Sequence, residues 1–153
     1  MRLMERARRL IPALWAGVLM CIALIATPAP FAILASHEAG RVVGRIIAQE
    51  AYLSLALGVA VLLLERRAAS SSVPGGSRFS TPIILALAAI FCTVFGYFGL
   101  QPMLDVARAG QGSWTFGQLH AVSLAFFAGK MAAVSALAWR ACGPPISSAG
   151  PSS

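Results

Sequence analysis

The sequence is short of charge, and of acidic residues above all. Charged residues make up 11% of its 153 residues, with five Asp and Glu against twelve Lys and Arg. Soluble domains carry about twice that share of charged residues, so the composition excludes an ordinary soluble domain. The net charge of +7 is typical of nucleic-acid-binding proteins. The arginines, however, lie at the ends of apolar stretches and form no continuous face, so we expect no nucleic-acid partner.

Cysteines are few and irregularly spaced. Cys21 and Cys92 fall inside apolar stretches, and Cys142 lies beyond the last of them. Without a C-x-x-C pair or a regular spacing, the sequence predicts neither a disulfide framework nor a zinc site. We interpret the cysteines inside the apolar stretches as small packing residues.

Catalytic and cofactor motifs are also missing. The sequence contains no phosphate-binding loop, no Ser-His-Asp order and no H-E-x-x-H motif, so we predict that the protein is not an enzyme. It has two histidines, His37 and His120. No third histidine or cysteine supports a metal site, and we predict no metal and no cofactor. A haem held by both histidines stays open as an alternative.

What the sequence does contain is four long apolar stretches. They run over residues 10–35, 42–64, 81–104 and 116–139. A helix of about 20 residues crosses a bilayer core of about 30 Å, whereas an open sheet would leave unpaired backbone groups in lipid. The sequence therefore predicts an all-α membrane protein. We expect a four-transmembrane-helix bundle over residues 10–140 in contact with the lipid bilayer, between a basic segment of residues 1–9 and a disordered tail of residues 141–153.

The limits of these helices are marked by breakers and caps. The uncharged run from Leu10 to Ser36 is longer than the apolar region of a signal peptide, which predicts a retained first helix. Pro28 and Pro30 are expected to end or kink it. Ser36, with Glu38 in the first turn, is expected to start the second helix. Gln101-Pro102 is expected to end the third helix, and the Ser- and Gly-rich connection of residues 68–80 to be flexible.

Basic residues are distributed unevenly between the two sides of the predicted bundle. One side holds Arg2, Arg6, Arg8, Arg9, Arg66, Arg67, Arg78 and Arg140, and the other holds Arg41, Arg45 and Arg108. Because short cytoplasmic segments carry the excess of Lys and Arg, we expect both termini in the cytoplasm. The predicted location is the bacterial inner (cell) membrane, as a multi-pass protein.

Glu50 and Lys130 are the charged residues deepest inside the apolar stretches. A charge there is unfavourable unless it is paired or hydrated, so we expect Glu50 to face the bundle interior, with Ser54 one turn further on. His120, Ser123 and Lys130 form a polar stripe on the fourth helix. Counted from the start of each apolar stretch, Glu50 lies at the depth of His120, whereas Lys130 lies nearer the cytoplasm.

Glu50 and Lys130 are natural partners by charge, but their depths differ, and whether they pair stays open. The depths favour His120 as the partner of Glu50 and a Lys130 side chain that reaches to the cytoplasmic interface. The candidate intramembrane polar site comprises Glu50, Gln101, His120, Ser123 and Lys130. Two interpretations stay open. One is a hydrogen bond that locks the bundle, and the other is a proton or cation site.

Small residues predict where the helices approach each other closely. Stripes of this kind let backbones pack where lipid supplies no hydrophobic drive. They are Ala13, Gly17 and Cys21 in the first helix, Ser54 and Gly58 in the second, and Gly96 and Gly99 in the third.

Several short segments carry a family resemblance. They are Trp15-Ala16-Gly17, Ala29-Pro30-Phe31, the segment of residues 39–45 leading to Glu50-Ala51-Tyr52, and the segment of residues 116–123. With them the chain resembles bacterial four-helix membrane proteins that contain the domain of unknown function 4149, similar to the transmembrane protein 205 group. The resemblance implies a membrane-embedded bundle without an established activity. It marks Pro30, Phe31, Gly40 and Gly44 as family-motif positions, together with His120 and Ser123.

We therefore predict a structural or accessory membrane protein without catalytic activity, alone, as a homo-oligomer or with other membrane proteins. A small proton- or ion-coupled transporter or pore component, acting as an oligomer, is one alternative. A haem-associated membrane redox protein using His37 and His120 is the other.

Overall fold

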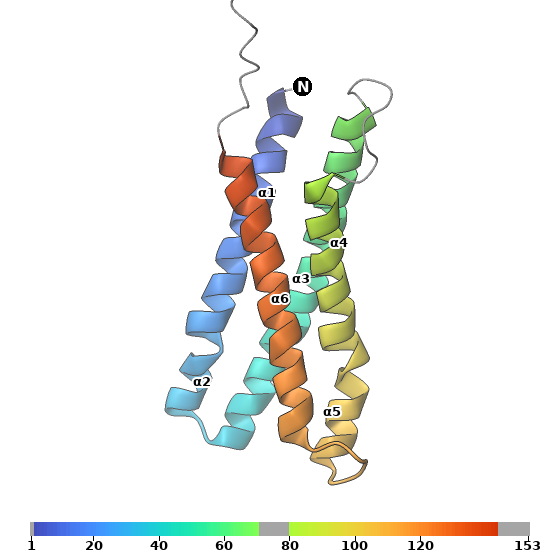
Figure 1. Cartoon of the computed structure of the whole chain (residues 1–153). Helices are drawn as coiled ribbons and strands as arrows, with labels where there is room; N and C mark the ends of the chain where they lie inside the picture. The colour runs from blue at the N-terminus through green and yellow to red at the C-terminus, as the bar shows by residue number, and fades with distance from the viewer. Residues whose placement is uncertain (1, 71–79, 144–153) are drawn as a thin grey trace, which may run out of the picture.

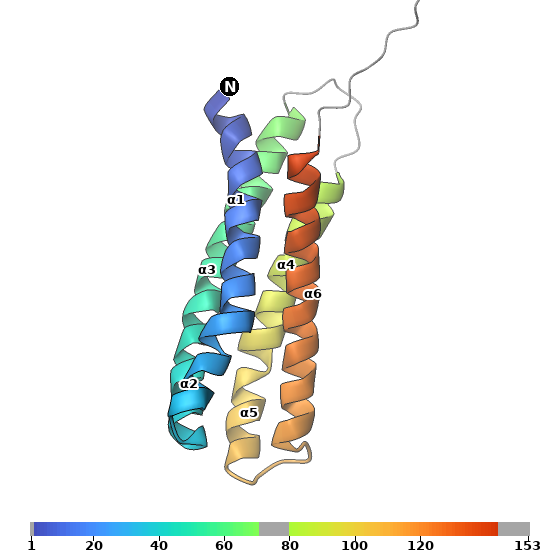
Figure 2. The same cartoon turned by 90° about the vertical axis from the view of Figure 1, so that its left-hand side faces the viewer.

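The computed structural model describes residues 2–70 and 80–143, and within these ranges the chain is helical without strands. The elements, in order, are α1 (Arg2–Cys21), η1 (Ile22–Ala26), α2 (Pro28–Ile33), α3 (Ser36–Ser70), α4 (Thr81–Thr93), η2 (Val94–Gly99), α5 (Gln101–Arg108) and α6 (Phe116–Cys142). Both η segments are π-helical. They join their neighbours into four long rods, as Figures 1 and 2 show.

The four rods form one elongated bundle (Figure 1). α1 packs against α6 and α3, and α4 packs against the same two helices, so the rods form a closed ring. The start of α1, the end of α3, the start of α4 and the end of α6 lie together at what we call the N-terminal end. The α2–α3 and α5–α6 connections lie at the opposite end, which we call the α5 end.

Each rod is long and apolar enough to cross a membrane. The four candidate spans are Leu3–Ile33, Ser36–Ala69, Thr81–Arg108 and Phe116–Cys142. Many of their large apolar side chains point away from the bundle, among them Leu14, Leu24, Leu63, Phe91 and Leu124. Soluble proteins rarely expose apolar surface on this scale. The chain is therefore a multi-pass membrane protein whose outer surface faces lipid.

The bundle interior is built from few large and many small side chains. One buried cluster contains Trp15, Leu19, Ala89, Ala133 and Val134. A second cluster, nearer the N-terminal end, contains Val61, Ala86 and Leu137. Alanines at these positions bring the helices close enough for dispersion contacts to replace the missing hydrophobic drive in lipid.

The predicted close approaches are confirmed at Gly58 and Gly96. A Cβ at Gly58 would lie 2.7 Å from Ile90 Cγ1, and one at Gly96 would lie 2.5 Å from Phe126 Cβ. The stripe predicted in the first helix is wrong, because its three small residues are exposed and no atom lies within 4 Å of a Cβ built at Gly17. α1 turns its opposite face inward, where Trp15 fills the centre of the bundle.

Prolines mark breaks in the first and third rods near the α5 end. The break in the first rod was predicted from Pro28 and Pro30. η1 ends at Ala26, and α2 begins at Pro28. The third rod differs from the prediction, because Gln101-Pro102 does not end it but starts α5. Pro102 occupies the first turn, where a missing N–H costs no helical hydrogen bond.

Helix ends also differ from the predicted ones. α3 begins at Ser36 with Glu38 in its first turn, as expected, but continues to Ser70. Arg2 to Arg9 of the predicted basic segment are helical, as are Ala141 and Cys142 of the predicted tail. The rest of the flexible connection and of the tail, residues 71–79 and 144–153, lies outside the described residues. α6 starts with a capping box, in which Thr115 Oγ1 accepts from Gln118 N and Gln118 Oε1 accepts from Thr115 N.

Candidate intramembrane ion-pair site

One face of α3 carries a row of buried residues that includes Glu50 of the candidate site. The residues at its centre are Glu50, Ser54, Gly58, Val61 and Glu65, and all are buried. Their spacing of three or four residues places them on a single face of the helix. Since this face is turned toward α1, α4 and α6, the two carboxylates point into the bundle and not into lipid.

Glu50 forms a buried ion pair with Lys130 of α6. Lys130 Nζ lies 2.7 Å from Glu50 Oε1 and 2.7 Å from Glu50 Oε2. Both residues are 3% exposed. The ammonium also lies 4.9 Å from the centroid of the Phe127 ring, within the range of a cation–π interaction. The two charges thus compensate each other where neither could stand alone.

A hydrogen-bonded chain extends the pair to a third helix. Trp15 Nε1 of α1 donates to Ser54 Oγ at 2.9 Å, and the Ser54 hydroxyl donates in turn to Glu50 Oε1. The chain Trp15–Ser54–Glu50–Lys130 therefore links α1, α3 and α6. Among the described residues every buried side-chain nitrogen and oxygen has a partner, which is the condition for a stable polar network in a low-dielectric interior.

A small cavity borders the ion pair. Its volume is about 20 Å³. It is lined by Ile47, Glu50, Cys92, Thr93, Gly96, Tyr97, Ser123, Phe127 and Lys130. Space of this size holds about one water molecule. No substrate larger than water fits beside the pair in this conformation.

A larger pocket lies elsewhere, at the α5 end. It has a volume of about 280 Å³ and is open and mostly apolar. Its lining comes from α5, the following connection and the start of α6, including Met103, Trp114 and Leu119. It contains none of the buried charged groups, so we do not regard it as the candidate site.

The predicted partner of Glu50 was wrong. His120 lies one turn into α6, is exposed and stacks on Phe116 with ring centroids 5.7 Å apart. The prediction that Lys130 reaches to the cytoplasmic interface is wrong as well. Both predictions measure depth from the first apolar residue of each stretch, whereas α3 begins six residues earlier, at Ser36. Measured from the first residues of α3 and α6, Ser36 and Phe116, both Glu50 and Lys130 lie fourteen positions along their helix. Fourteen residues correspond to about 21 Å of helical rise, so the two side chains lie at the same depth.

The other predicted site residues are divided between the cavity and the surface. Ser123 lines the cavity, and its hydroxyl donates to Gly96 O at 3.1 Å. Gln101 lies apart from the pair, with Nε2 3.4 Å from Asp105 Oδ1. The structure therefore joins Ser123, but not Gln101, to Glu50 and Lys130.

The family-motif positions of the first two rods do not form a site with the ion pair. Pro30 is buried, and Phe31 is half exposed. No atom lies within 4 Å of a Cβ built at Gly40 or Gly44. His37 is exposed like His120, and within residues 2–70 and 80–143 no three His, Cys, Asp or Glu side chains come together as a metal site.

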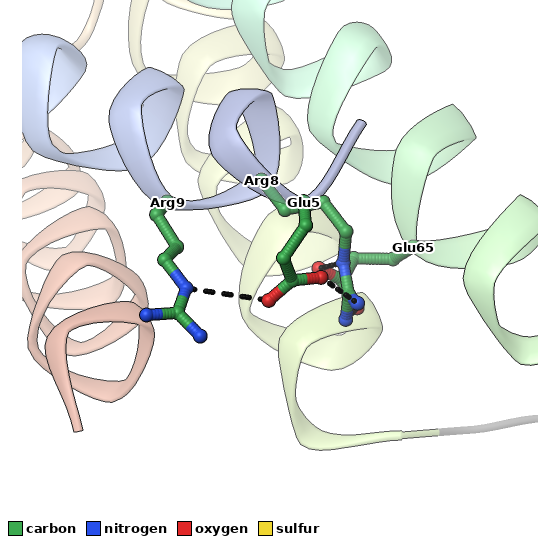
Figure 3. A network of polar contacts seen from close by, with 4 residues as sticks. All are labelled: Glu5, Arg8, Arg9 and Glu65. Atoms are coloured by element: carbon green, nitrogen blue, oxygen red, sulfur yellow. Dashed lines mark hydrogen bonds and ion pairs between the residues drawn. The ribbon is translucent and has the colours of Figure 1, made fainter. Parts of the chain in front are cut away.

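A second buried carboxylate, Glu65, was missed by the sequence analysis. Arg8 donates to it from Nε at 2.9 Å and from Nη2 at 2.8 Å, a bidentate pair that links α1 to α3. Figure 3 shows this network, in which Glu5 also accepts from Arg8 and Arg9. The signal was present, because Glu65 shares the helical face of Glu50 and Ser54.

Comparison with known proteins gives one finding. A family model described as "Domain of unknown function (DUF4149)" matches residues 10–113. The match covers more than half of the chain, so the chain belongs to this family. No curated protein and no solved structure matches it.

Proposed function

For this member of the DUF4149 family, we propose a structural or accessory role in the membrane, without catalytic activity. The observation that carries the proposal is the closed ion pair between Glu50 and Lys130, both 3% exposed, beside a cavity of about 20 Å³. Because each charge already has its partner and the space holds about one water molecule, the site holds helices together and leaves no room for a substrate.

The physical role of such a pair is to fix the arrangement of helices. A buried pair gains little net stability over apolar residues of similar volume, but removing one partner costs about 3–5 kcal/mol. Any helix register that separates Glu50 from Lys130 incurs that cost. Since Trp15 and Ser54 continue the network to α1, three of the four rods are held in one register.

Three variants test the locking role. Glu50→Gln and Lys130→Met each leave one buried charge without its partner, and the double variant leaves none. We expect each single variant to lower the thermal unfolding midpoint in mild detergent strongly, and the double variant to recover most of the loss. The exposed acid Glu38 of the same helix supplies the control Glu38→Gln, with an effect within about 0.5 kcal/mol. Additive losses in the double variant would contradict the proposal.

For the location, we propose the bacterial inner membrane with both termini in the cytoplasm. The support comes from the basic N-terminal end of the bundle, which carries Arg6, Arg8, Arg9, Arg66, Arg67 and Arg140. Membrane proteins keep such an excess on the cytoplasmic side. The bacterial assignment and the likeness to the transmembrane protein 205 group are supported by the motif resemblance.

A transporter or pore component is the second candidate function. It is favoured by one observation, that Glu50 and Lys130 share their cavity with the hydroxyls of Thr93 and Ser123. One four-helix bundle encloses little space, so this function requires an oligomer. A native mass spectrum of the protein released from mild detergent tests this function. A defined oligomer would support a pore component, whereas a monomer without bound lipid or cofactor would contradict it and favour the structural role.

A further inference from the structure

We propose that the larger pocket, at the α5 end, binds the acyl chain of one membrane glycerolipid, with the ester groups of that lipid at Gln111 and Ser113. The volume of this pocket, about 280 Å³, is just below the range of small-molecule sites, about 300–1,000 Å³. A single chain fits such a space, whereas a helix of a second protein, about 10 Å across with its side chains, is too wide for it. The site does not rest on the structural role proposed above.

The pocket lies across the boundary of the membrane-spanning region. Pro102, Met103 and Val106 of its lining belong to the third candidate span. Leu119 belongs to the fourth span, and residues 111–114 lie in the connection between the two, at the lower end of the bundle in Figures 1 and 2. One part of the pocket is therefore beside lipid chains and the other beside the polar surface of the bilayer. A ligand with an apolar chain and a polar head matches both parts.

The part of the lining inside the spans is apolar. Met103 and Val106 are 41% and 46% exposed, whereas Leu119 is 3% exposed and forms the inner wall. Empty apolar space forfeits dispersion contacts, and a bound water needs polar partners, which these three side chains do not offer. Apolar space of this kind beside a bilayer is therefore filled by a lipid chain, which the bilayer supplies in large excess.

The connection that completes the pocket is fixed by local structure. Gly110 and Gly112 have φ angles of 72° and 97°, which residues with a Cβ rarely adopt. Gln111 N donates to Val106 O at 3.1 Å, and a Cβ built at Gly112 would lie 3.3 Å from Val106 Cγ1. The capping box at Thr115 holds the other end of the connection. The wall is therefore in place before a ligand arrives, as in most small-molecule sites.

The polar end of the pocket carries neutral hydrogen-bond donors. Gln111, Ser113 and Trp114 line it and are exposed. Their amide, hydroxyl and indole groups donate hydrogen bonds, which the ester carbonyls of a glycerolipid accept, and tryptophan is typical of membrane interfaces. None of the eight lining residues, all of which the structure describes, carries a charge. The site therefore recognises the ester region of a lipid and does not distinguish a zwitterionic head group from an anionic one.

Native mass spectrometry tests the site. The full chain is reconstituted into vesicles of phosphatidylethanolamine and phosphatidylglycerol in equal amounts with identical acyl chains, and is then released into mild detergent. We expect one lipid adduct per chain, with both lipids represented equally. Met103→Trp should lose the adduct, because the larger side chain occupies the pocket. Met20→Trp is the matched control, since Met20 is 47% exposed on α1 and lies outside the pocket, and it should keep the adduct.

Four outcomes would overturn the proposal. Two are a wild-type chain without an adduct and equal retention by the two variants. A third is retention of phosphatidylglycerol alone, which would assign the lipid to the arginines. The fourth is a dimer that Met103→Trp dissociates, which would make the pocket an interface between two copies of the chain. The number of chains and the lipid adduct are separate masses in one spectrum, so the pore component is tested independently of the lipid site.

A photoreactive lipid locates the site within the bilayer. Phosphatidylcholine with a diazirine on its acyl chain, added to vesicles that contain the protein, should cross-link to residues 102–119 more than to the other lipid-facing segments. In Met103→Trp the labelling of residues 102–119 should fall to the level of those segments, whereas Met20→Trp should leave it unchanged. Labelling spread evenly over the four rods of the wild-type chain would indicate ordinary boundary lipid only and would overturn the proposal.

Discussion

At the scale of single residues, the protein depends on a few polar side chains and on glycines without space for a side chain. Glu50, Lys130 and Glu65 are buried charges with bidentate partners. A charge-assisted pair of this geometry is stronger than a neutral hydrogen bond. It is also costly to break, because the remaining charge stays in a low-dielectric interior. We therefore expect the largest effects of substitution at these positions.

Glu65→Gln is predicted to destabilise the protein more than Glu5→Gln does. Glu65 has a side chain 10% exposed and accepts two short hydrogen bonds from Arg8, whereas Glu5 is 51% exposed. We expect a loss of about 1–3 kcal/mol at Glu65 and less than about 1 kcal/mol at Glu5. Thermal unfolding in detergent measures both, and equal effects would show that Glu65 behaves as a surface acid.

Gly96→Ala and Gly44→Ala form a matched pair of glycine substitutions. A Cβ at Gly96 would lie 2.5 Å from Phe126 Cβ, whereas nothing lies within 4 Å of a Cβ at Gly44. Overpacking predicts a loss of about 1–3 kcal/mol at Gly96. At Gly44 the better helix propensity of alanine predicts a gain of up to about 1 kcal/mol. Strong destabilisation by Gly44→Ala would indicate a contact with a partner outside this chain.

At the scale of elements, helix ends are set by local chemistry and helix faces by packing. α6 begins where Thr115 and Gln118 form a capping box, and α2 and α5 each carry a proline in the first turn. Such ends can be found from sequence, because a cap needs residues only three positions apart. The inward face of α1 could not be predicted in this way. One face of α1 carries small residues and the opposite face carries large ones, and contacts with the neighbouring helices decide which face turns inward.

Thr115→Ala tests the capping box. It removes the oxygen that accepts from Gln118 N, and loss of such a cap costs about 1 kcal/mol. Hydrogen exchange should increase in the first turn of α6, around Phe116 and Leu119, and remain unchanged near Lys130. Faster exchange along the whole helix would mean that the cap supports α6 as a unit and not only its first turn.

At the scale of the whole molecule, the bundle separates a basic end from an end with mixed charges. The N-terminal end carries the Arg8–Glu65 pair and further arginines, and the Glu50–Lys130 pair lies about 21 Å along α3 and α6 from their starts at the α5 end. Two ion pairs at different depths fix both the register and the tilt of α3 against its neighbours. The charge asymmetry in turn predicts the orientation in the membrane.

The orientation can be measured at Cys142, which is exposed at the end of α6. In a variant with Cys21→Ser and Cys92→Ser, a membrane-impermeant thiol reagent should label Cys142 in inverted vesicles and not in intact cells. Labelling in intact cells only would reverse the proposed topology. Detergent-solubilised protein is the control, since there the thiol should react in every case.

The sequence by itself determined that this is a helical, multi-pass membrane protein. Its four apolar stretches have the length and composition to cross a bilayer, and in lipid an α-helix is the structure in which each stretch hydrogen-bonds its own backbone groups. It also predicted that Glu50 lies buried, since an exposed carboxylate at that depth is unfavourable. Which residue pairs with Glu50 was decided by tertiary structure alone. The side chains of Lys130 and His120 share a helix, and the choice between them depends on how α3 and α6 are aligned. That alignment is set by contacts between residues 80 positions apart, which no local pattern encodes.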